Sequence, residues 1–183
     1  MLDIEDLRDR LDRARHDLFR METLPAYAVV SDGDDFHRWV AGETEPSMDR
    51  IQPWLDRLSS ERDAGKIRSR VRLLSADLTD YERYSCEWGY ALTTAAGEDI
   101  RVLRAGEHDI PIDIASEDFW LVDDRDLLLM RYDADGGFLG AQGVTDARAV
   151  ESFRRARDVA WQAAEPFGQW WARHPELHRA VTV

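Results

Sequence analysis

Residues 117–141, EDFWLVDDRDLLLMRYDADGGFLGA, constrain the fold more than any other stretch of this sequence. Two apolar runs, Phe119–Val122 and Leu127–Tyr132, are separated by the polar residues 123–126, which is typical of two strands joined by a hairpin turn. Neither run alternates strongly enough to leave one side facing water. Both are therefore expected to be central strands that helices cover.

A second turn and a third strand extend this hairpin. Asp133–Gly137 combines aspartate, which can bond to its own backbone, with glycine, which tolerates positive φ. The strand Phe138–Ala141 is expected to follow. These residues predict an antiparallel C-terminal meander, and the turn is preferred to a calcium-binding loop because the later glutamate of such a loop is missing.

The whole pattern predicts an α/β (α+β) fold in a single domain, residues 1–183, with a mixed central sheet of about five to six strands. Helices are expected at both termini, over about residues 2–19 and about 147–174. The predicted strands are Ala26–Val30, Ile67–Leu74, Ile100–Leu103, Phe119–Val122, Leu127–Tyr132 and Phe138–Ala141. Trp120, Leu121, Leu128 and Met130 are expected to be buried.

Charge and composition exclude several classes of protein. There are 37 acidic and 24 basic residues, a net charge of −13, and a chain of this sign repels a nucleic-acid backbone. We therefore expect no direct nucleic-acid binding. No apolar run reaches the roughly 18 residues of a membrane helix, and no secretory pattern begins the sequence. With Cys86 as its single cysteine, the chain is expected to be cytoplasmic.

One predicted strand carries an unusual row of cations. Alternation along Ile67–Leu74 places Arg68, Arg70 and Arg72 on one face. Planar guanidinium groups suit carboxylate or phosphate recognition, so this face is the candidate ligand site. Arg101, on the next predicted strand, joins the row if the register allows it.

Two readings of this row remain open. Either acidic side chains of the protein neutralise the arginines, or an anionic metabolite or nucleotide does so. A structural ion-pair network is the commoner outcome. The internal candidates for pairing are Glu87, Glu98 and Asp123, and the candidates for hydrogen bonding or stacking are Tyr81 and Tyr90.

Other reactive residues lack the context that their chemistry needs. Cys86 lies in an aromatic segment without a nearby histidine, so a buried inert thiol is expected. His174 and His178 flank Pro175 and do not form a zinc-binding helix; a frayed terminus is expected there. No Gly-rich phosphate loop and no Gly-x-Ser-x-Gly elbow occur. The sequence predicts no catalytic residue, no metal site and no cofactor.

Several blocks of sequence, taken in combination, resemble a known family. They are RMETLPAYAV at 20–29, FHRWVAGE at 36–43, LTDY at 78–81, WGY at 88–90, AGEDIR at 96–101, DFWLVDD at 118–124 and YD at 132–133. Over about residues 18–161 the chain resembles the actinobacterial DUF6879 proteins. That resemblance implies a regulatory accessory, because such proteins are often encoded beside helix-turn-helix regulators and small DUF397 proteins.

A weaker similarity is to half of a phospholipase D-like domain, in the catalytically dead form of that fold. The active form needs a His-x-Lys motif. The only lysine, Lys66, follows Ala64 and Gly65, so that chemistry is absent. The fold analogy does not assign a function.

The function expected from these features is a non-enzymatic regulatory module. Its expected partner is a helix-turn-helix transcriptional regulator or a DUF397-type small protein, and an acidic chain suits a basic DNA-binding partner. The alternative is a protein that binds an anionic small molecule, or an enzyme of unknown reaction, that uses the Arg68/Arg70/Arg72 face. The sequence leaves the oligomeric state open.

Overall fold

The computed structural model describes residues 1–28, 34–112, 114 and 117–179. Within this part of the chain, one mixed sheet of seven strands has the order β6-β5-β4-β1-β2-β3-β7. The strands are β1 (Asp17–Glu22), β2 (Ile67–Leu74), β3 (Asp99–Arg104), β4 (Phe119–Val122), β5 (Asp126–Tyr132), β6 (Phe138–Val144) and β7 (Glu165–Pro166).

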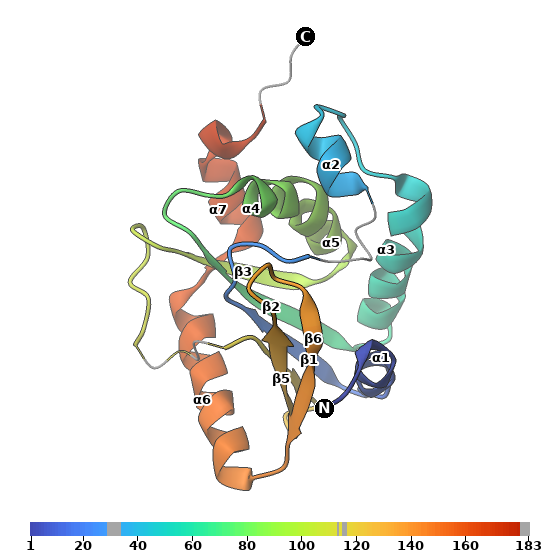
Figure 1. Cartoon of the computed structure of the whole chain (residues 1–183), viewed down its shortest axis with the longest axis vertical. Helices are drawn as coiled ribbons and strands as arrows, with labels where there is room; N and C mark the ends of the chain where they lie inside the picture. The colour runs from blue at the N-terminus through green and yellow to red at the C-terminus, as the bar shows by residue number, and fades with distance from the viewer. Residues whose placement is uncertain (29–33, 113, 115–116, 180–183) are drawn as a thin grey trace.

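Helices cover both faces of this sheet (Figure 1). The long helix α6 (Ala147–Ala163) packs on one face, where its residues meet those of β1 and β4. The other face is covered by the remaining larger helices. These are α1 (Ile4–Asp12), α3 (Met48–Asp63), α4 (Asp80–Tyr84), the π-helix η2 (Ser85–Tyr90), α5 (Ala91–Ala96) and α7 (Phe167–Arg173); α2 (Asp35–Val40) and the 3-10 turn η3 (Pro175–Leu177) lie beyond them.

The predicted fold class is confirmed. Strands β1, β2 and β3 are parallel, whereas β4, β5 and β6 form the antiparallel meander that continues the sheet from β1. The sheet is slightly larger than expected because β1 and β7 were not predicted as strands. In the meander Leu121, Leu128 and Met130 are buried, but Trp120 is only half-buried.

The predicted N-terminal helix over residues 2–19 is wrong in its second half. Helix α1 ends at Asp12, and residues 17–22 form the central strand β1. The leucines at helical spacing favour a helix, but Phe19 and Met21 alternate with Arg20 and Glu22 and are buried on opposite faces of the sheet. Side chains on both faces of this segment are buried in the sheet, and this burial outweighs the helical spacing of the leucines.

The predicted strand Ala26–Val30 lies partly outside the described residues. In the described part, Ala28 forms a single isolated parallel bridge with Gly137, and this bridge does not extend into a strand. At the other end of the chain, the predicted helical segment over 147–174 is interrupted. Residues Glu165 and Pro166 pair with β3 as strand β7 and separate α6 from α7.

The turn between β4 and β5 holds the start of β1 in place. Asp123 and Asp124 both adopt left-handed backbone, with φ of 48° and 57°, as the second strand must return directly beside the first. The Asp123 carboxylate accepts the backbone N–H groups of Arg15, His16 and Asp17 at 2.7–3.1 Å. Burial raises the pKa of Asp123, but these N–H donors more than offset this and hold the pKa at about 2.

We predict that Asp123→Asn destabilises the protein by about 1–3 kcal/mol, because an amide has one acceptor oxygen and its NH₂ faces other donors. Urea unfolding at pH 7 measures this change. Asp126→Asn is the matched control: Asp126 is the exposed first residue of β5, directly after the turn, and its substitution should stay within about 0.5 kcal/mol of the wild type. Equal effects of the two substitutions would contradict the role of Asp123.

Candidate functional site

A strip of charged side chains crosses the middle of the sheet on the face opposite α6. The parallel register places Arg20 beside Arg70 and Glu22 beside Arg72 on the neighbouring strands β1 and β2. Apolar clusters flank the strip, one beneath α1 and the other beneath α7. Adjacent buried cations repel each other, so their position requires carboxylates between them.

Arg70 holds two of these carboxylates. Its Nη1 donates to Glu22 Oε1 at 2.7 Å, and its Nε and Nη2 donate to Glu98 Oε1 at 3.0 and 2.8 Å. The hydroxyl of Tyr90 donates to the second oxygen of Glu22 at 2.9 Å. Burial raises the pKa of Glu22, but Arg70, Arg20 and Arg72 more than offset this and hold the pKa at about 2.

Asp118 is the other hub of the strip. It precedes β4 and is 3% exposed. One of its oxygens accepts from Arg20 Nη2 at 2.8 Å and from the Tyr27 hydroxyl at 2.7 Å. The other accepts from the backbone N–H and the hydroxyl of Thr23, both at 2.7 Å. Asp118 thereby joins the end of β1 to the start of β4, and Tyr132 accepts a further bond from Arg20 at 2.7 Å.

Arg72 is the least satisfied member. Its side chain is fully buried, and its guanidinium lies 5.2 Å above the Tyr27 ring and 3.3 Å from the Tyr27 hydroxyl. The nearest carboxylate, Glu82, is 4.0 Å away and is engaged by the backbone of Ser75 and Thr79. Nε and Nη2 of Arg72 have no hydrogen-bond partner among the described residues. This guanidinium therefore keeps two donors in a solvent-excluded position.

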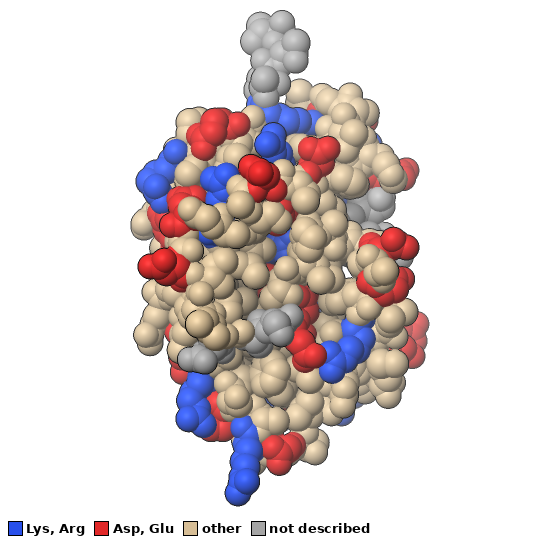
Figure 2. All heavy atoms as spheres, turned by 60° about the vertical axis from the view of Figure 1, so that its left-hand side comes forward, with Lys and Arg blue, Asp and Glu red and all other residues tan. Residues whose placement is uncertain are grey.

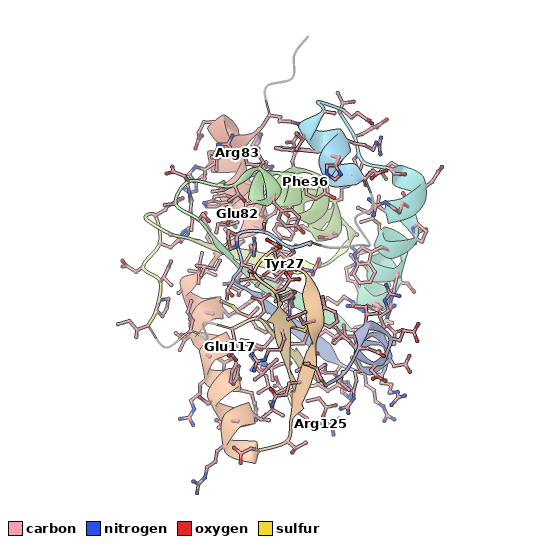
Figure 3. All side chains as sticks on the ribbon, viewed as in Figure 1. Tyr27, Phe36, Glu82, Arg83, Glu117 and Arg125 are labelled. Carbon is pink, nitrogen blue, oxygen red and sulfur yellow. The ribbon has the colours of Figure 1, made fainter. Side chains whose placement is uncertain are left out.

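The strip lies where an α/β sheet usually builds a site. Tyr27 and Glu82 sit at the carboxyl ends of β1 and β2, above the sheet (Figure 3). In open α/β sheets, ligands often bind outside the carboxyl ends of parallel strands. The adjoining π-helix η2 carries Tyr90, and π-helical turns are frequent at functional sites.

The structure brings together four of the predicted site residues: Arg70, Arg72, Tyr90 and Glu98. Arg68 lies at the far end of the row, where it pairs with Glu61 and stacks on Trp54. The Tyr81 ring contacts the Tyr27 ring at the edge of the strip, at a centroid distance of 6.1 Å.

Three predicted residues do not join the strip. Arg101 lies opposite Val71 in the β2–β3 register and so faces α6, where it donates to the carbonyl of Trp161 and stacks on that ring. Glu87 accepts from the Trp39 indole instead. Asp123 is held by backbone N–H groups at the opposite end of β1.

Sequence reasoning missed half of the strip. Arg20 and Glu22 follow the predicted helix over residues 2–19, and Asp118 precedes the predicted strand Phe119–Val122, so none of the three is placed on a predicted element, whereas the structure puts Arg20 and Glu22 on β1. The alternation of Phe19–Glu22 was the available signal. Tyr27 had no distinguishing pattern, whereas Glu82 belongs to the Thr-x-x-Glu capping box that begins α4, a signal that places it at a helix start but not beside Arg72.

The strip combines arginines and carboxylates with two tyrosine hydroxyls that stay neutral. Three arginines face four carboxylates, and burial raises the pKa of the Tyr27 and Tyr90 hydroxyls, so both stay neutral donors at pH 7. Burial likewise raises the pKa of Cys86, which keeps its thiol protonated. The ion pairs rigidify the sheet, and Nε and Nη2 of Arg72 are the donors of this arrangement that can bind an anionic group.

A second cluster of titratable side chains ties α7 to the loop after β3. His174 Nε2 lies 3.0 Å from Glu107, and Trp170 also donates to Glu107, so the expectation of a frayed terminus is wrong for this segment. Glu107, His108 and Glu165 approach one another closely enough for a cation. However, Nδ1 of His108 accepts the N–H of Arg104, which leaves the proton of a neutral ring on Nε2. This geometry favours hydrogen bonding over metal ligation.

We predict that stability falls in acid because of Glu22. Its pKa in the unfolded chain is about 4.3, and its folded value is about 2. A carboxylate with a lowered folded pKa stabilises the protein above the unfolded value, and this contribution is lost as the pH falls towards the folded value. Urea midpoints should therefore decline from about pH 5 to 2. The decline should be shallower in Glu22→Gln; equal slopes would contradict this assignment.

Comparison with known protein families identifies a match over most of the chain. A family model described as a domain of unknown function, DUF6879, covers residues 5–172. No curated protein matches the chain. Among the described residues, no helix is long and apolar enough to cross a membrane.

Proposed function

The chain belongs to the DUF6879 family, and from this premise we propose that it is a non-enzymatic regulatory module, acting in the cytoplasm, that binds a helix-turn-helix transcriptional regulator. The observation that carries the non-enzymatic part is the pairing within the charged strip. Asp118 pairs with Arg20, and Glu22 and Glu98 pair with Arg70. These carboxylates therefore act as structural anchors. The regulatory part rests on the sequence resemblance to proteins encoded beside such regulators.

Net charge supports a basic partner. A chain of net charge −13 attracts a cationic DNA-binding protein and speeds its association. On the face shown in Figure 2, acidic and basic side chains are interspersed. The attraction of a basic partner is therefore expected from the net charge of the whole protein and not from one acidic patch. Salt weakens this attraction, because the Debye length is about 10 Å at 0.1 M ionic strength.

Affinity capture of the tagged protein from its native host, at low and high salt, tests this proposal. A helix-turn-helix regulator should be captured at low salt and lost at high salt. The purified pair should then form a complex on size-exclusion chromatography, and operator DNA should compete with or join it. Absence of any such regulator at low salt counts against the proposal. Capture of a DUF397-type protein alone would identify that protein as the partner in place of the regulator.

Arg72 favours a second candidate function, the binding of an anionic small molecule at the carboxyl ends of β1 and β2. Two of its donor nitrogens are buried without a hydrogen bond to any described residue, whereas Arg68 and Arg70 donate directly to carboxylates. Native mass spectrometry of the protein purified from its host should then show a bound anion. Arg72→Met should lose it and Arg68→Met should keep it. Unliganded mass in the wild type would exclude this candidate.

A further inference from the structure

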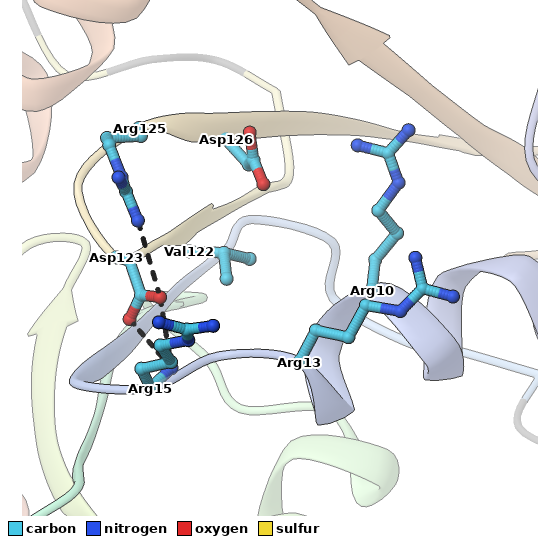
Figure 4. A pocket seen from close by; sticks show the side chains of 7 residues that line it. All are labelled: Arg10, Arg13, Arg15, Val122, Asp123, Arg125 and Asp126. Atoms are coloured by element: carbon cyan, nitrogen blue, oxygen red, sulfur yellow. Dashed lines mark hydrogen bonds and ion pairs between the residues drawn. The ribbon is translucent and has the colours of Figure 1, made fainter.

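An open hollow lies at the opposite end of β1 from the charged strip, between α1 and the β4–β5 turn (Figure 4). Its volume is about 440 Å³. The polar side chains that line it come from α1, the following loop and the turn: Arg10, Arg13, Arg15, Asp123, Arg125 and Asp126. A hollow of this size is within the range of small-ligand sites, roughly 300–1,000 Å³.

The hollow is electropositive in an acidic protein. Four arginines line it against two aspartates, while the whole chain carries a net charge of −13. Asp123 neutralises these arginines only weakly, because its oxygens already accept three backbone N–H groups. Its nearest guanidinium in the hollow, that of Arg125, lies 4.0 Å away. The local surplus of positive charge is therefore available to a ligand.

The arginines are also free to bind. Arg13 reaches Asp9 only at 3.8 Å, in an exposed pair of little energetic weight. The guanidinium groups of Arg10 and Arg15 have no hydrogen bond or ion pair with the described part of the chain. The negative end of the α1 dipole accounts for cations at its last turn, but not for Arg15 and Arg125, which come from other segments.

We propose that this hollow binds the phosphate groups of a polyphosphate-type ligand. Several guanidinium forks around one space suit oxyanions with many acceptors, and a phosphate chain offers more of them than a single carboxylate. Among the residues that the structure describes, Val122 is the only apolar side chain that lines the hollow. The site therefore lacks an apolar or aromatic wall for a base, and the phosphates themselves carry the recognition. This inference is independent of the proposed protein partner.

Calorimetry of the full chain with inorganic pyrophosphate at low ionic strength tests the inference. Binding should be measurable in the wild type and weaken as salt is added. Arg10→Gln and Arg15→Gln should each lower the affinity about tenfold, the equivalent of about 1.4 kcal/mol. Arg8→Gln is the matched control, because Arg8 is exposed on α1 outside the hollow and its loss changes the net charge equally. Its affinity should stay within about twofold.

Two further ligands separate the possible sources of binding. Adenosine triphosphate should bind about as tightly as pyrophosphate, and citrate, a carboxylate of similar charge, at least tenfold more weakly. No binding of pyrophosphate, or an equal loss in Arg8→Gln, would overturn the proposal. Equal affinity for citrate would overturn the assignment to phosphate. Circular dichroism of each variant establishes that the fold is retained, since these exposed side chains make few contacts.

Discussion

Asp118→Ala should destabilise the protein by about 3–5 kcal/mol, the cost of removing one partner from a buried ion pair. The substitution removes the acceptor of Arg20, Tyr27 and Thr23 and leaves their donors buried. Because domains have total stabilities of about 5–15 kcal/mol, this loss shifts a large part of the population towards the unfolded state. Urea denaturation at pH 7 measures it.

Two further variants test whether this loss comes from the buried pairing of Asp118. Asp118→Asn keeps an acceptor for Thr23 but loses the charge that faces Arg20, so an intermediate loss is expected. Glu117→Ala is the matched control: Glu117 is exposed and pairs with Arg131 on the surface, and its loss should cost no more than about 1 kcal/mol. A value for Asp118→Ala as small as that of Glu117→Ala would show that Asp118 does not anchor the strip.

Arg70→Met should cost about 3 kcal/mol or more at pH 7, since Glu22 and Glu98 then lose their shared cation while they remain buried. In the variant the pKa of Glu22 rises, because Arg70 is the cation that contributes most to lowering it, so this carboxyl takes up a proton as the pH is lowered. A group with a raised folded pKa stabilises the fold at low pH and loses this contribution as the pH rises through that value. The deficit relative to the wild type should therefore shrink from pH 7 to about pH 4.

Arg68→Met is the control for this experiment. Its partner Glu61 lies nearer to solvent and keeps Arg57 and Lys66 as partners, so a smaller, weakly pH-dependent loss is expected. A deficit at Arg70 that matches the one at Arg68, or that does not change with pH, would contradict the network. Arg70 is consequently a poor position for testing ligand binding, because its removal disturbs the fold.

The meander and the arginine row were accessible from the sequence because their signals are local. Alternation in Ile67–Leu74 determines which side chains share a face, and that strand has the predicted bounds. The bounds of β4, Phe119–Val122, are also as predicted. By contrast, the first half of β1 lies within the predicted helix over residues 2–19, because it follows leucines at helical spacing, and only burial on both faces distinguishes this segment as a strand.

The sequence by itself determined that Arg68, Arg70 and Arg72 project to one side of a strand, because the period of a β-strand is a property of the backbone. Only the tertiary structure decided which charges meet them. Arg70 finds Glu22 across 48 positions of sequence, and Arg20 finds Asp118 across 98. The β2–β3 register placed Arg101 on the other face. Pairings between distant segments depend on strand order and register, which are set by the burial of the whole sheet and not by any local pattern.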